Sequence, residues 1–454
     1  MDPLTLAEIA QMSGGRLENG GGALTASKLS KDTRNLQPGD LYLALRGEKF
    51  DGNQFLEAAI RAGAVGALVD DESLVARFPD FPLIVTADSL AALQQLAGSW
   101  RSRLSLRVVG LTGSSGKTST KDFTAAVLGE RFQVTTTAGN LNNHIGLPLS
   151  ILAATSRDQF AVWEMGMNHP GEIEPLARLA RPDFAIVTGI GVAHIENLGS
   201  REAIAAEKGG LVRLTSPHGA VILNAEDDFT PALAKAAPGD VITVGLQAGD
   251  LRAEAIEFDS AGSRFALLHG SERVPATLPV AGEHMVRNAL LAVAVGLEAG
   301  LSLEECAAGL AKSRLTAGRL TTRAIRGMVV LDDSYNANPD SVEAALKTLS
   351  KIPAQGRRIA ALGKMGELGD YAETGYRRAG RAAADGRLDI LVTVGAETQP
   401  LAEEAETRGL SHVFRTDNTA AAATLLRSLA RPGDLVLIKG SRSARMEQIL
   451  TGLE

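Results

Sequence analysis

The sequence predicts an α/β protein of three domains with mainly parallel sheets. Short runs of Val, Ile and Leu recur along the chain, each followed by a glycine-containing turn and an Ala/Leu-rich helical pattern, which is typical of βαβ units. Glycine supplies 48 of the 454 residues, whereas aromatic residues make up only 4%. At roughly 150 residues per domain, the length favours about three domains.

The composition is that of a folded protein without a basic surface. Hydrophobic residues make up 45% and charged residues 22%, enough for several buried cores. The formal charge is −7, and no basic run stands out, so we expect no nucleic-acid binding. The single cysteine, Cys306, excludes an intramolecular disulfide. Without a signal-like segment or a long apolar run, we expect a cytoplasmic protein with no membrane insertion.

Residues 1–85 are expected to form a small N-terminal α/β module. Its strand-like pieces are residues 40–45 and 66–69, on either side of a helical segment at residues 55–62. A further helical segment, residues 89–102, precedes the next strand. We therefore place the first boundary near residue 85.

Residues 86–318 and 319–454 are expected to form a central and a C-terminal domain, each with its own set of buried strands. A helix at residues 303–311 and a connection around Gly318 separate the two sets. The central strands are expected at residues 107–111, 161–165, 184–188 and 220–223, and the C-terminal strands at residues 329–332, 358–362, 390–394 and 435–438. This pattern predicts a parallel-sheet central domain and a Rossmann-like C-terminal domain.

The strongest motif is a glycine loop between the strand at residues 107–111 and a helical segment at residues 121–128. It reads Gly113-Ser114-Ser115-Gly116-Lys117-Thr118-Ser119. Backbone N–H groups of such a loop bind phosphate oxygens, the lysine reaches the β and γ phosphates, and the threonine hydroxyl ligates magnesium. Leu111 stands where the eight-residue P-loop pattern has its first glycine, so the match is to the shorter G-x-x-G-K-T form. We predict that the central domain is a P-loop ATPase domain.

Two further side chains follow predicted central strands. Glu164 ends one strand, and His194 follows the next strand and a glycine-rich loop. A carboxylate at a buried strand end is costly unless it is paired or binds a metal, and the pair suits a hard cation such as Mg²⁺. Lys208, in a helical segment, reads from its own surroundings as a solvated surface lysine.

Together these segments resemble the Mur ligases, which are ATP-dependent amino-acid and peptide ligases of peptidoglycan precursor synthesis. The match follows the family's order over essentially the whole chain. The residues that carry it are Gly113 to Thr118, Glu164 in Glu-Met-Gly-Met, His194 in Ala-His-Ile-Glu, Lys208 in Glu-Lys-Gly, Asn288 in Arg-Asn-Ala, Arg319 in Gly-Arg-Leu, and Asp333 to Pro339.

Within the family, residues 139–148, 333–339 and 439–442 are most similar to the members that join D-alanyl-D-alanine to UDP-N-acetylmuramoyl-tripeptide. Residues 30–40 resemble a uridine-nucleotide module. The resemblance thus implies these two partners and an acyl phosphate intermediate. Two alternatives stay open: a related ligase that adds a single amino acid to a UDP-muramoyl-dipeptide, and a P-loop ATPase that works as a switch without ligation.

The resemblance also implies site residues, and we expect a monomer. Lys117, His194, Lys208 and Arg319 are expected to be catalytic. ATP is assigned to residues 113–119 with Asn288, Arg319 and Asp333; Mg²⁺ to Thr118, Glu164, His194 and a carbamylated Lys208; and the other substrates to Asp32, Thr33, Arg34, Asn142, Asn143, Asn336 and Asn338. One departure is Lys364, which stands where the family usually has an acidic residue.

Overall fold

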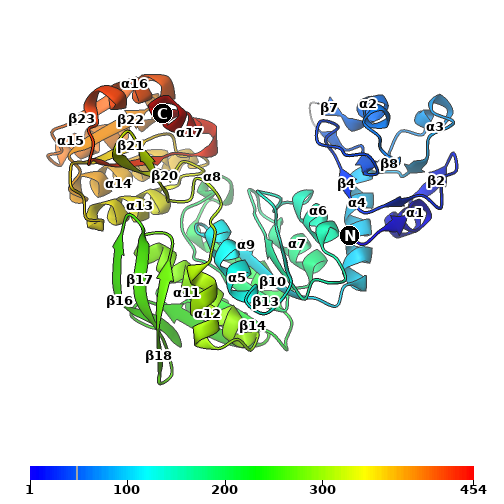
Figure 1. Cartoon of the computed structure of the whole chain (residues 1–454), viewed down its shortest axis with the longest axis horizontal. Coiled ribbons are helices and arrows are strands. Elements are labelled where there is room, and N and C mark those ends of the chain that lie inside the picture. Colours follow the sequence, from blue (N-terminus) through cyan, green and yellow to red (C-terminus); the bar gives the residue numbers. More distant parts are fainter. Residues whose placement is uncertain (48–49) are drawn as a thin grey trace. The chain divides into compact units, whose positions relative to one another are not determined.

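The computed structural model describes residues 1–47 and 50–454 and confirms the α/β fold class (Figure 1). The chain divides into two units. The first contains residues 1–110, 132–166 and 172–183, and the second contains residues 111–131, 167–171 and 184–454. No helix in these described ranges is long and apolar enough to cross a membrane.

The first unit contains a five-stranded sheet in the order β2-β9-β8-β5-β4, in which only β2 runs antiparallel to its neighbour. Tyr42, Leu56 and Val69 are buried in its core. Strands β11 and β12 also pair in parallel. The helices of this unit are α1 (Leu6–Ser13), α2 (Leu56–Arg61), α3 (Ser73–Arg77), α4 (Ser89–Arg103), α6 (Gly146–Ala153) and α7 (Ile173–Ala180). The strands are β1 (Leu4–Thr5), β2 (Arg16–Glu18), β3 (Thr25–Ala26), β4 (Leu29–Ser30), β5 (Leu41–Leu43), β6 (Arg46–Gly47), β7 (Phe50–Asp51), β8 (Gly66–Val69), β9 (Leu83–Val85), β11 (Val134–Thr136) and β12 (Phe160–Glu164).

The second unit begins within β10 (Arg107–Thr112) and contains two sheets. Its helices are α5 (Lys117–Leu128), α8 (Ile195–Leu198), α9 (Arg201–Arg213), α10 (Thr230–Lys235), α11 (Glu283–Glu298), α12 (Leu303–Ala311), α13 (Pro339–Lys351), α14 (Ala372–Asp385), α15 (Gln399–Thr407), α16 (Thr419–Leu429) and α17 (Glu447–Leu453). Its strands are β13 (Phe184–Val187), β14 (Ala220–Asn224), β15 (Asp240–Gly245), β16 (Leu251–Asp259), β17 (Gly262–His269), β18 (Glu272–Leu278), β19 (Thr321–Ile325), β20 (Met328–Asp333), β21 (Arg358–Leu362), β22 (Ile390–Val394), β23 (Val413–Thr416) and β24 (Leu435–Lys439).

In the first of these sheets, β13, β14, β15 and β16 pair in parallel, and β16, β17 and β18 form an antiparallel extension (Figure 1). This extension was not expected from the sequence, because its strands lack a continuous apolar run. In β18 only alternate residues, Val274, Ala276 and Leu278, are buried. Such alternation is the pattern of an antiparallel strand with one exposed face.

The other sheet of the second unit has the order β19-β20-β24-β21-β22-β23. Strand β19 is antiparallel to β20, and the remaining pairs are parallel. Helices α16 and α17 cover one face, where their apolar side chains pack on strand residues such as Val392, Val436 and Ile438, while α13 and α14 lie on the opposite face (Figure 1). In an open parallel sheet, sites form at the carboxyl ends of the strands, here at Asp333 and Lys439.

Candidate functional site

The glycine loop joins β10 to α5, so the predicted strand, loop and helix are present. Gly113 and Gly116 have positive φ angles of 150° and 83°. A Cβ atom at Gly113 would lie 1.8 Å from Oγ1 of Thr188, and one at Gly116 would lie 2.7 Å from Oδ1 of Asn288. Both positions therefore need glycine for backbone shape and for space. The Nζ atom of Lys117 donates to the carbonyl of Gly113 at 2.7 Å, which holds the lysine over the loop.

The chain after β13 braces this loop. The backbone N–H of Ser114 donates to the carbonyl of Gly189 at 2.9 Å, and the Gly191 N–H donates to Oγ of Ser114 at 2.9 Å. The Thr188 hydroxyl donates to the carbonyl of Ser115 at 2.5 Å. A cavity of about 620 Å³ opens beside these residues. The phosphate loop is thus fixed by the chain after β13, and both segments line the cavity.

Arg319 reaches the phosphate loop from the connection before β19. Its Nη2 atom donates to Oγ1 of Thr118 at 3.0 Å. The guanidinium carbon lies 4.1 Å from the ring centroid of Tyr335, a cation–π contact that orients the group. Two residues assigned to ATP from sequence resemblance are therefore in direct contact, although 201 positions separate them.

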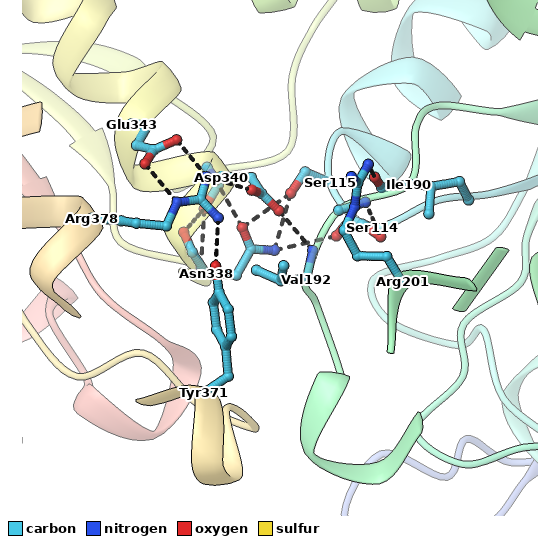
Figure 2. Close-up of polar contacts among 12 residues, drawn as sticks. Ser114, Ser115, Ile190, Val192, Arg201, Asn338, Asp340, Glu343, Tyr371 and Arg378 are labelled. Carbon is cyan, nitrogen blue, oxygen red and sulfur yellow. Dashed lines mark hydrogen bonds and ion pairs between the residues drawn. The ribbon is translucent and has the colours of Figure 1, made fainter. Parts of the chain in front are cut away.

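The start of α13 also contacts the phosphate loop (Figure 2). Asn338 caps this helix, because its side chain accepts from the Ser341 N–H at 2.9 Å. Its amide nitrogen donates to Oγ of Ser115 at 3.0 Å and to the carbonyl of Ser114 at 3.4 Å. Asp340 accepts from the Val192 N–H at 2.8 Å. One helix end therefore contacts both the phosphate loop and the loop that leads to His194.

Lys208 is not the solvated surface lysine that its local sequence suggested. Its side chain is 1% exposed within α9. Burial, and then the positive charge of Lys117, hold the pKa of Lys208 well below its usual value. The same two causes favour the neutral, nucleophilic form of the amine over the charged form.

His194 has a left-handed backbone, with φ of 65°, at the start of α8. Its Nδ1 atom contacts the carboxylate of Glu367, and this contact is the largest cause of the lowered pKa of Glu367. Nε2 is the ring nitrogen left to meet a ligand. Within residues 1–47 and 50–454, no group of three or more His, Cys, Asp or Glu side chains is arranged to hold a metal ion, so a metal site here needs other donors, such as a threonine hydroxyl.

A buried ion pair lies at the carboxyl ends of β20 and β24. Lys439 Nζ is 2.6 Å from Asp333 Oδ2 and donates to the carbonyl of Asn336 at 3.0 Å. Parallel pairing places Asp333 and Lys439 in register. The side chain of Asn336 accepts from the Ala337 N–H at 2.9 Å, and Lys439 holds the same segment from β24. Asn288, the residue assigned to adenine, is 7% exposed.

The remaining predicted residues lie in the first unit. The Arg34 side chain donates two hydrogen bonds, of 2.9 and 2.7 Å, to the Asp32 carboxylate, and these bonds lower the pKa of Asp32 to about 2. Thr33 lies between the two residues in the sequence. Asn142 Nδ2 donates to Oε1 of Glu164 at 2.8 Å. Asn143 accepts from the Gly146 N–H at 2.9 Å, a bond that stabilises the start of α6.

Four residues around the site were not predicted from the sequence. Tyr335 contacts Arg319 and Glu367 contacts His194, whereas Asp340 contacts Val192 and Arg378. Tyr335 and Glu367 lie in segments that were noted only for their resemblance, and Asp340 follows the Asn-Pro pair. Arg378 has no local signal, because it lies in an Arg- and Ala-rich helix that reads as a surface helix. Lys364, the departure from the family pattern, forms an ion pair of 2.8 Å with Glu397, and both side chains are about half exposed.

The fold and loop define a nucleotide-binding α/β protein whose phosphate loop is contacted by residues that flank the strands of a second, mainly parallel sheet. Residues 26–97 match the "Mur ligase family, catalytic domain", residues 111–296 the "Mur ligase middle domain", and residues 318–442 the "Mur ligase, glutamate ligase domain". The chain is 36% identical to the UDP-N-acetylmuramoyl-tripeptide–D-alanyl-D-alanine ligase of Bacillus subtilis, over 99% of this chain and 98% of that protein. The chain belongs to the Mur ligase family.

Solved structures agree with this assignment. A crystal structure of MurF from Acinetobacter baumannii superposes with a TM-score of 0.89 at 32% identity, covering 100% of this chain and 99% of that one. MurF ligase from Thermotoga maritima in complex with ADP superposes with a TM-score of 0.81 at 26% identity, covering 94% and 96% of the two chains. The three-domain architecture of the family is therefore the architecture of this protein.

Proposed function

We infer that this protein joins D-alanyl-D-alanine to UDP-N-acetylmuramoyl-tripeptide at the expense of ATP and produces the UDP-muramoyl-pentapeptide. The observation that carries the inference is similarity over the full length to ligases of that name. The braced phosphate loop fits it, since the reaction needs ATP. In the first step, the tripeptide carboxylate attacks the γ-phosphorus and gives an acyl phosphate and ADP. The dipeptide amine then attacks the acyl carbon, and phosphate leaves.

Phosphoryl transfer needs positive charge and alignment more than it needs a protein nucleophile. Lys117 lies over the loop, and Arg319 contacts Thr118 from 201 positions further along the chain. We assign both cations to the charge that develops on the γ-phosphate. Asp333 is assigned to the ribose and Asn288 to the adenine, as the family resemblance implies.

We propose that Mg²⁺ binds here with Thr118, His194 and a carbamylated Lys208 among its ligands, and Glu164 stays a predicted ligand. The bound ion would supply charge neutralisation for the phosphates. The donor set fits a hard cation because carbamylation converts an amine into an oxygen ligand. The lowered pKa of buried Lys208 supports this, since only the neutral form of an amine attacks carbon dioxide.

We further propose a monomer that acts in the cytoplasm and does not bind nucleic acid. Cys306 is a free, buried thiol whose pKa is raised to about 12, chiefly by burial, so it is chemically inert in a reducing compartment. Sedimentation at micromolar concentration tests the monomer, and a dimer mass would contradict it.

The function is tested by phosphate release from Mg-ATP with UDP-N-acetylmuramoyl-tripeptide, with and without D-alanyl-D-alanine, together with the product mass. We expect release that requires both substrates and a pentapeptide product. Release with ATP alone would favour an ATPase switch. Release only with a UDP-muramoyl-dipeptide and a free amino acid would identify the related ligase instead.

A further inference from the structure

Asp340 connects two parts of the second unit that the reaction must hold together (Figure 2). Its Oδ2 atom accepts from the backbone N–H of Val192 at 2.8 Å, and its Oδ1 atom accepts from Nη2 of Arg378 at 3.1 Å. Val192 lies in the loop between β13 and His194. The carboxylate therefore links α13, which follows the strand of Asp333, to the loop that leads to His194.

Arg378 is itself held firmly. Its Nε and Nη2 atoms donate to the two carboxylate oxygens of Glu343 at 2.9 and 2.7 Å, and Nη1 donates to the Tyr371 hydroxyl at 3.0 Å. Burial alone would lower the pKa of Arg378, but its bonds to Glu343 and Tyr371 and the nearby carboxylates raise it above its usual value. The guanidinium is thus a fixed, charged anchor for Asp340.

The loop on the other side is shaped to receive this carboxylate. A Cβ atom on Gly191 would lie 2.0 Å from Oδ2 of Asp340 and 3.4 Å from Cβ of Ser114. The φ angle of Gly191 is not positive, so the backbone conformation does not itself require glycine. Glycine is needed at this position because a larger residue would collide with Asp340. The Gly191 N–H donates to Ser114, and the next N–H, of Val192, donates to Asp340. Consecutive backbone groups of one loop are therefore held by the phosphate loop and by α13.

We propose that Asp340 is a positioning residue for ligation: by bridging Arg378 to the Val192 N–H, it holds the loop that carries His194 against the phosphate loop. This rests on the proposed function. The competing explanation is that Asp340, in the first turn of α13, only stabilises that helix through its dipole. A helix-stabilising residue would change the melting temperature, whereas a positioning residue must change kcat and the order of the loop.

The variants Asp340→Ala, Asp340→Asn, Gly191→Ala and the Asp340→Ala/Gly191→Ala double variant test the bridge. We expect Asp340→Ala to lower kcat about tenfold to a hundredfold, the range for loss of a hydrogen bond to a charged group, with little change in KM for the UDP-linked substrate. Asp340→Asn should recover part of kcat, because its amide oxygen still accepts from Val192. Gly191→Ala should resemble Asp340→Ala, and the double variant should be no worse than either alone.

Amide hydrogen exchange of Val192, measured without substrates, tests the Asp340 bridge independently of the proposed function. Asp340→Ala should raise the exchange rate of this amide about tenfold or more. Arg377→Ala is the matched control, since Arg377 lies next to Arg378 but pairs with Glu373 at 2.8 Å, and it should change neither quantity. Unchanged Val192 exchange, additive losses in the double variant, or a lower melting temperature with normal kcat would each overturn the proposal. Absence of the pentapeptide product in the wild type would instead overturn the function.

Discussion

The predicted uridine-nucleotide residues and the phosphate loop are built in opposite ways. Asp32 and Arg34 are two positions apart and pair at the surface, where the Arg34 side chain is 86% exposed. The phosphate loop is held by Arg319 and Asn338, which contact it across 201 and 223 positions of sequence. The Asp32–Arg34 pair is held by contacts within its own short segment, whereas the phosphate loop depends on contacts from distant parts of the second unit. Substitutions in the two regions should therefore change different measured quantities.

The largest expected effect is at Lys208. Lys208→Ala should lower kcat about a thousandfold, because the carbamate is lost, and added formate or acetate should restore part of it by entering the space left. Lys208→Met is the matched control: it fills the same space without an amine, so it should be inactive and not rescued. Steady-state assays with and without the acid check this. Normal turnover in either variant would show that Lys208 is structural.

Substitution of Lys439 tests whether the buried ion pair also contributes to the free energy of unfolding. Lys439→Met leaves the buried carboxylate of Asp333 without its 2.6 Å partner, so the free energy of unfolding should fall by about 3 kcal/mol. Adding Asp333→Asn should recover part of that loss, since no charge is then left unpaired. Denaturant unfolding measures both. Losses that simply add would mean that the two side chains do not interact.

Arg319→Ala should lower kcat about a hundredfold and leave the unfolding free energy nearly unchanged. Its ring contact offers a finer test. Tyr335→Leu should produce a smaller loss of kcat, because Arg319 loses its stacking partner, while Tyr335→Phe keeps the ring and should be close to normal. Equal losses for the Leu and Phe variants would assign the effect to the hydroxyl rather than to the cation–π contact.

The smallest effect is expected in the first unit. Arg34→Ala should raise KM for the UDP-linked substrate several-fold at unchanged kcat, and it should change the unfolding free energy by less than about 0.5 kcal/mol, as exposed substitutions usually do. Kinetics with varied UDP substrate and a melting curve test it. A loss of kcat with normal KM would mean that the two regions do not differ as proposed.

The same contrast explains what could be predicted from sequence. Strands such as β21 and β22 match the expected residues 358–362 and 390–394, because both faces are buried and the apolar run is continuous. The phosphate loop was readable because its glycines, lysine and threonine are adjacent. The antiparallel strands β16, β17 and β18 were missed because their exposed faces interrupt the apolar signal.

Site residues brought in by tertiary contact could not be read locally. Lys208 looked like a surface lysine, and only the family resemblance gave it a role, since its burial arises from packing of α9. Arg378 and Glu367 contact Asp340 and His194 from distant segments. Nothing in their own sequence surroundings distinguishes them from solvated charges, so neither was predicted.

The contact between Ser115 and Asn338 can form only late in the synthesis of the chain. Their 223-residue separation means that a ribosome adding about 5 to 20 residues per second makes Asn338 roughly 10 to 45 s after Ser115. During that interval the nascent phosphate loop has β10 and α5 but not the cap of α13. We therefore expect an unfinished chain that ends before residue 338 to bind nucleotide weakly, so that ATP engagement comes late in the biogenesis of the enzyme.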